Sequence, residues 1–142
     1  MLKISNGKMN TLITKIEDIK FELEAIQQFL EISISEDMNE VEQRGNELTV
    51  YMARSGKLLA DAKYHRDEKL NSAIVEELKK ILQLAPSTAN KYIDALTKEE
   101  NYLVSWSKRV NRTCTHQIDW CRTLISKAKE EMRVSSYGSR TN

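Results

Sequence analysis

The sequence predicts an all-α fold: a long antiparallel helical hairpin with an additional N-terminal coiled-coil-like helix. Its 142 residues include one proline and four glycines, too few for the many turns of a β-rich chain. Charged residues make up 30% and aromatic residues 6%, as in elongated helical proteins with much solvated surface. Apolar residues also recur every three or four positions along most of the chain, which is the period of an amphipathic helix.

Six aliphatic residues near the N-terminus follow the spacing 4, 3, 4, 3, 4 that keeps one seam of a helix facing a partner helix. A helix this short is marginal in isolation, so the seam needs a partner. It could fold back on the rest of the chain or meet its own copies, and we expect a homo-oligomer. The predicted oligomerisation residues are Leu12, Ile16, Ile19, Leu23, Ile26 and Leu30.

A second helix is predicted to begin at Ser35, because serine can cap a helix and the two acids that follow favour the helix dipole. The spacing of three and four residues then continues from Met38, which predicts one helix of roughly 45 to 50 residues, about 70 Å long. Gly45 and Gly56 each weaken this helix by about 1 kcal/mol or allow a close helix approach, and either could mark a bend. The last apolar positions assigned to it are Leu70, Ile74, Leu78 and Ile81.

The chain is interrupted at Pro86, which lacks an amide donor, while Ser87 can cap the helix that follows. That third helix is predicted to be as long as the second, and the two should pack antiparallel with residues near 54 opposite residues near 118. The expected organisation is therefore an N-terminal heptad helix and linker (1–34), a hairpin with its apex near Pro86 (35–133) and a flexible tail (134–142).

Nothing in the sequence indicates an enzyme. It contains none of the glycine-rich phosphate-binding motifs and no nucleophile motif, so we expect no catalytic residues, no cofactor and no small-molecule substrate. Cys114 and Cys121 are about 10.5 Å apart along a helix, too far for shared zinc ligation, and His116 points away from Cys121. We expect two buried or half-buried thiols, no metal and no disulfide.

No window contains the roughly 18 uninterrupted apolar residues of a membrane span, and the first ten residues lack the apolar core of a signal peptide. We therefore expect a cytoplasmic protein that does not enter a membrane. The net charge of +1 conceals a polarity: residues 1–50 hold five Lys/Arg and ten Asp/Glu, whereas residues 101–142 hold eight and three. This polarity suggests an acidic partner or a head-to-tail contact, although uneven solvated faces would produce it too.

Basic and aromatic residues gather where the two hairpin helices should lie together. Lysine and arginine neutralise phosphates without reading sequence, and aromatic rings stack on unpaired bases. The pattern is typical of single-strand binding, although a helical tryptophan is as often a core or interface anchor. The predicted nucleic-acid-binding residues are Arg54, Lys57, Lys63, Arg66, Trp106, Lys108, Arg109, Arg112 and Arg122, with Tyr51, Tyr64 and Trp120 interleaved.

Two segments, Tyr51 to Lys63 and Thr115 to Cys121, lie in a stretch from Asn46 to Met132 that resembles small helical proteins of tailed phages and prophages. More distantly, the chain resembles the UvsY-type recombination mediators of phages, which are short, all-helical and oligomeric and load a recombinase onto single-stranded DNA. The heptad segment and the Pro86 break depart from that pattern, so the mediators' mode of assembly cannot be transferred. The resemblance implies a role in DNA metabolism and, for a phage protein, the host cell cytoplasm.

We therefore expect a non-enzymatic, oligomeric helical protein that binds single-stranded DNA or DNA-handling proteins of recombination or replication. The alternative is a structural or adaptor protein that acts only through protein contacts, such as a virion component or an inhibitor of host defence.

Overall fold

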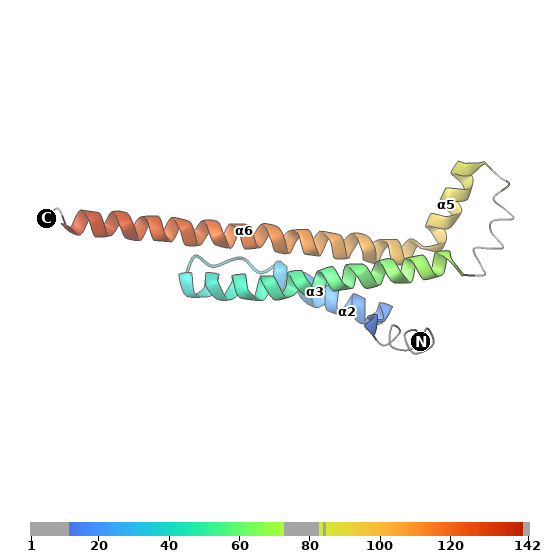
Figure 1. Ribbon diagram of the computed structural model, residues 1–142, viewed down its shortest axis with the longest axis horizontal. Helices are drawn as coiled ribbons and strands as arrows, with labels where there is room; N and C mark the ends of the chain where they lie inside the picture. The colour runs from blue at the N-terminus through green and yellow to red at the C-terminus, as the bar shows by residue number, and fades with distance from the viewer. Residues whose placement is uncertain (1–11, 73–82, 84, 141–142) are drawn as a thin grey trace, which may run out of the picture.

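The computed structural model describes residues 12–72, 83 and 85–140, and the regular elements in these ranges are all helices (Figure 1). They are α2 (Ile16–Leu30), α3 (Met38–Leu70), α5 (Pro86–Leu96) and α6 (Lys98–Arg140). The all-α prediction is confirmed. None of the helices in the described ranges is long and apolar enough to cross a membrane.

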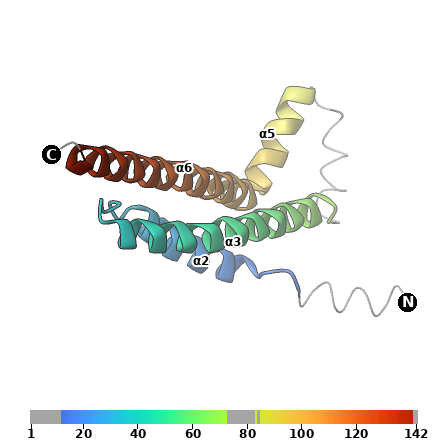
Figure 2. The same cartoon turned by 60° about the vertical axis from the view of Figure 1, so that its left-hand side comes forward.

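Helices α3 and α6 lie side by side and antiparallel (Figures 1 and 2). At one end Lys69 Nζ pairs with Glu100 Oε1 at 3.0 Å, and further along Asn111 Nδ2 donates to Ser55 Oγ at 3.0 Å. The expected register, with residues near 54 opposite residues near 118, is therefore wrong, because Asn111 occupies that place. Pro86, where the sequence placed the apex, is instead the first residue of a separate helix, α5 (Pro86–Leu96), and the helix that pairs with α3 begins only at Lys98.

Helix α3 is shorter than predicted at both ends. Its N-cap is Asp37, whose Oδ2 accepts from Glu40 N at 3.3 Å, whereas the expected cap Ser35 accepts from Asp37 N at 3.1 Å. Its last residue is Leu70, and Asn71 forms the C-cap. The predicted extension through Ile74, Leu78 and Ile81 lies outside the described residues. Gly45 and Gly56 both lie within the 33-residue helix without ending it.

The predicted third helix is divided in two. Pro86 is the first residue of α5, with Ala85 before it as N-cap, so Ser87 is not the cap. Thr97 separates α5 from α6 and donates from Oγ1 to the carbonyl of Ile93 at 2.9 Å. Helix α5 leaves the line of α6 at an angle (Figure 2), while α6 continues through Arg140 where a flexible tail was expected.

Four of the six predicted oligomerisation residues are buried in the chain's own core. Ile19, Leu23, Ile26 and Leu30 are 0–7% exposed and belong to one cluster with buried residues of α3 and α6. Ile16 is half-buried against that cluster, and Leu12 is exposed. Placing this seam between copies is therefore wrong for this structure. A short linker keeps α2 close to α3 and α6, so an intramolecular contact forms without the entropic cost of association.

Candidate nucleic-acid interface

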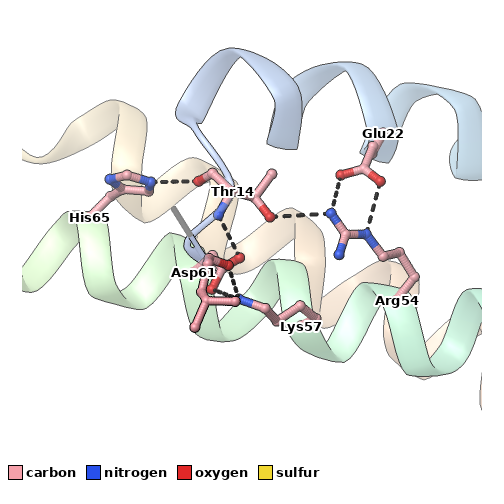
Figure 3. Close-up of polar contacts among 7 residues, drawn as sticks. Thr14, Glu22, Arg54, Lys57, Asp61 and His65 are labelled. Atoms are coloured by element: carbon pink, nitrogen blue, oxygen red, sulfur yellow. Dashed lines mark hydrogen bonds and ion pairs between the residues drawn. The ribbon is translucent and has the colours of Figure 1, made fainter. Parts of the chain in front are cut away.

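The N-terminal segment is held to α3 by a polar cluster that includes two of the predicted DNA-binding residues (Figure 3). Arg54 donates two hydrogen bonds to the carboxylate of Glu22, at 2.8 and 2.6 Å, and a third to Thr14 Oγ1 at 3.2 Å. The hydrogen bond with Glu22 raises the pKa of Arg54. A bidentate pair of this kind fixes the orientation of both partners, so Arg54 positions α2.

The next turns of α3 hold the backbone that precedes α2 (Figure 3). Asp61 accepts from Thr14 N at 2.9 Å and from Lys57 Nζ at 2.5 Å, and Lys57 also donates to the carbonyl of Leu12 at 2.9 Å. His65 Nε2 lies 2.7 Å from the carbonyl of Thr14 and donates a hydrogen bond to it in the tautomer that carries the proton on Nε2. Burial acts to raise the pKa of Asp61, but the hydrogen bonds from Lys57 and Thr14 hold it below its ordinary value.

Arg54 and Lys57 are therefore engaged by the chain itself, which the sequence did not indicate, because their partners Leu12, Thr14 and Glu22 are more than thirty residues away. Two further predicted residues have a carboxylate beside them. Arg66 pairs with Asp67 at 3.3 Å, and Arg122 pairs with Asp119 at 3.4 Å. Lys63 is half-buried on α3.

Trp106 anchors α2 to α6. Its ring is half-buried against the core, and Nε1 donates to Gln27 Oε1 at 3.2 Å. The ring of Tyr102 lies beside it, with 5.8 Å between the centroids. The expected role of Trp106 as an exposed stacking platform therefore conflicts with its position, because a base would have to compete with α2 for the same ring.

Three predicted residues do form one accessible basic surface. Lys108, Arg109 and Arg112 are all exposed and line a shallow hollow on α6 together with Ser105. Among the described residues no carboxylate forms an ion pair with any of the three. They lie within about one turn of each other, so their fields add over a Debye length of roughly 8 Å at physiological salt. We refer to Ser105, Lys108, Arg109 and Arg112 as the basic hollow.

Two exposed aromatic residues flank the basic hollow. Trp120 was expected among the interleaved aromatic residues, but Trp106 was the predicted stacking residue, and Tyr102 was not predicted. Tyr102 is 63% exposed and Trp120 is 52% exposed. Eighteen residues, or five turns of about 3.6 residues, separate them, so they lie on one line of α6 about 27 Å apart. His116 is also exposed between them. Two features of the sequence could have identified this pair. One is the five-turn spacing, and the other is that the line through Tyr102 and Trp120 lies on a different face of the helix from the apolar line through Val110, Cys114 and Cys121.

The two cysteines are buried free thiols on the core side of α6, as expected. Burial raises the pKa of both Cys114 and Cys121, which disfavours the reactive thiolate. In the described part of the chain, no three His, Cys, Asp or Glu side chains are grouped so that they could hold a metal ion.

Comparison with known proteins found no matching family model, no matching curated protein and no matching solved structure. The resemblance to phage helical proteins and to UvsY-type mediators therefore stays a prediction from the sequence.

Proposed function

We propose that this chain is a non-enzymatic helical protein that binds single-stranded nucleic acid, without sequence preference, along the solvent face of α6. The observation that carries the proposal is the basic hollow, with three exposed cations that have no carboxylate partner among the described residues. Lys108, Arg109 and Arg112 would neutralise successive phosphates, and that contribution is the main source of non-specific affinity.

The flanking rings support a single strand as the ligand. Bases stack on aromatic faces only when they are unpaired, and stacking is tolerant of sequence because every base has a π-face. Tyr102 and Trp120 lie on either side of the hollow, whereas Trp106 serves the contact with α2. A duplex has no free bases for the rings and should bind less tightly.

A pair of charge-reversal variants tests the proposal. Replacing Arg109 and Arg112 by Glu should abolish or strongly weaken binding to a labelled single-stranded oligonucleotide, measured by fluorescence anisotropy. Replacing the exposed Lys15 and Lys91 by Glu changes the net charge equally but lies outside α6, and it should leave most of the affinity. Circular dichroism of both variants checks that the helices are intact.

The alternative is an adaptor that acts only through protein contacts. This alternative would be favoured if the Arg109/Arg112 and Lys15/Lys91 variants bound the oligonucleotide with equal affinity. It would also be favoured if the wild-type protein had no salt-sensitive affinity for any single strand. The resemblance to phage proteins implies that such a strand-binding protein acts in DNA recombination or replication. Its protein partner would then be another protein that handles DNA.

A further inference from the structure

The end of the molecule where α3 begins has fewer layers than the rest. Helix α2 stops at Leu30, whose carbonyl accepts from Gln117 Nε2 at 2.9 Å, so α2 does not cover the part of α6 that follows. We call the segments 38–49 of α3 and 118–134 of α6 the open end. Figure 1 shows α6 continuing there past the first turn of α3.

A groove runs between α3 and α6 at the open end. Gly45 lies in it, and a Cβ added at this glycine would meet only Cys121 Cβ, at 4.0 Å. The absent side chain leaves room above the backbone for a side chain from elsewhere. The groove is lined by Val41, Glu42, Gly45, Asn46, Thr49, Ile118, Cys121, Arg122 and Ile125.

The core-facing line of α6 continues beyond its cover. Along this line Cys121 and Leu124 are buried and Ala128 is half-buried, but Met132 is 70% exposed. The spacing of three and four residues from Cys121 to Met132 would place all of them in a core if a further helix lay alongside. The open end therefore carries both a largely exposed apolar side chain, Met132, and a groove that could receive one.

The two helices of the open end each present a charge beside the groove, and the two charges have opposite sign. On α3, Glu42 is exposed and lines the groove. On α6, Lys129 is exposed one turn after Ile125, which also lines the groove, so the two lie on one face of the helix. The ion pairs described in this region, Arg122 with Asp119 and Arg133 with Glu130, lie within α6 and do not join the two helices. An acidic and a basic side chain on one surface are complementary to the same surface of a second copy turned by a two-fold rotation.

We propose that the open end is the contact surface for a second copy of this chain, packed antiparallel with Met132 of each copy in the groove of the other. When the two α6 helices are antiparallel, α6 of one copy runs parallel to α3 of the other. If Met132 then lies at the level of Gly45 of the partner subunit, Lys129, three residues earlier, lies at the level of Glu42 of the partner subunit. The apolar contact and the charge contact then require the same register. The open end and the basic hollow share no residue, so the inference does not depend on the ligand of the basic hollow.

Sedimentation velocity over a range of concentrations tests the inference. Wild type should form a dimer, and Met132→Asp should raise its dissociation constant at least about tenfold, because a charge would enter an apolar groove. Val134→Asp is the matched control, since Val134 is 61% exposed but lies off the core-facing line, and it should leave the dimer intact.

Charge reversal tests the register independently. Glu42→Lys alone and Lys129→Glu alone should each weaken the dimer, and the double variant should restore it, because the pair re-forms with opposite signs. The proposal is overturned if wild type remains monomeric up to about 100 µM, if Met132→Asp dimerises like wild type, or if the double variant is weaker than both single variants. Loss of the dimer in Phe21→Ser alone would place the contact on the exposed face of α2 instead.

Discussion

Arg44 donates a hydrogen bond of 2.8 Å to Gln117 Oε1, and this contact joins α3 to α6 beside the end of α2. The same guanidinium donates to the carbonyl of Ile32 at 2.9 Å and lies 4.1 Å from the centroid of the Phe29 ring. Gln117 in turn donates to the carbonyl of Leu30. Two side chains thus satisfy backbone groups that α2 leaves free at its C-terminal end.

Gln117→Ala should destabilise the protein by about 2 kcal/mol, because it removes the acceptor of Arg44 and leaves the Leu30 carbonyl without its donor. Urea denaturation followed by circular dichroism measures the change. Gln43→Ala is the control, since Gln43 is exposed on α3 and its side chain donates to Glu47, and the change should alter the free energy of unfolding by less than about 0.5 kcal/mol. Equal effects of the two changes would show that the contact between Arg44 and Gln117 contributes little.

Because the heptad seam is buried, substitutions on the two faces of α2 should differ in how much they lower the free energy of unfolding. Leu23→Ala should cost about 2 to 5 kcal/mol, because Leu23 is fully buried and its loss leaves a cavity. Phe21→Ala removes a larger side chain that is 76% exposed, and it should cost less than about 0.5 kcal/mol. If Leu23→Ala had only a mild effect on unfolding but changed the oligomeric mass, the heptad seam would instead form a contact between copies of the chain.

The Asp61 carboxylate should make part of the protein's stability depend on pH in the acid range. Its pKa is lowered in the folded protein, so the unfolded chain takes up the proton first as the pH falls. The stabilisation is complete above the ordinary carboxyl pKa of about 4 and is lost as the pH falls through the lower folded value. Thermal melts should therefore show that Asp61→Asn lowers Tm strongly at pH 7 and much less near pH 3.

Glu36→Gln is the control for that experiment, because Glu36 is exposed and outside the Thr14 and Lys57 network. It should shift Tm by the same small amount at both pH values. An Asp61→Asn effect that is as large at pH 3 as at pH 7 would show that the network does not depend on the carboxylate charge.

The two tryptophans should separate stability from binding. Trp120→Ala should weaken binding to a single strand by about 1 to 3 kcal/mol and leave Tm unchanged, because the ring is exposed beside the basic hollow. Trp106→Ala should lower Tm, because it removes the contact with Gln27 and the packing against the core. Anisotropy and thermal melts of both variants check this, and a binding defect confined to Trp106→Ala would restore that ring as the stacking residue.

The sequence was sufficient for the helical class and for the pairing of two long helices, because apolar residues at steps of three and four specify one buried face. It was not sufficient for the helix ends. Asp37 and Ser35 are both good caps, and only the geometry of the chain decides between them. The break at Thr97 had a weak signal, because Thr97 with Glu100 three residues later matches the pattern of a capping box at a helix start.

The candidate site was only partly predictable for a different reason. A cation's availability depends on partners that are distant in sequence, and Glu22 lies 32 residues from Arg54. Lys108, Arg109 and Arg112 were chosen by the same criterion, and they differ only in having no such partner among the described residues. The heptad seam predicted correctly which face of the helix is buried, but a pattern does not distinguish a helix of the same chain from a helix of another copy.

The central claim is tested most directly by the salt dependence of wild-type binding to a labelled single-stranded oligonucleotide, with a duplex of the same sequence beside it. The account predicts that the logarithm of the association constant falls linearly with the logarithm of salt concentration, with a slope near −2 for three phosphate contacts at roughly 0.7 each, and that the duplex binds less tightly. An affinity that does not change with salt, no affinity for either nucleic acid, or tighter binding of the duplex would contradict it.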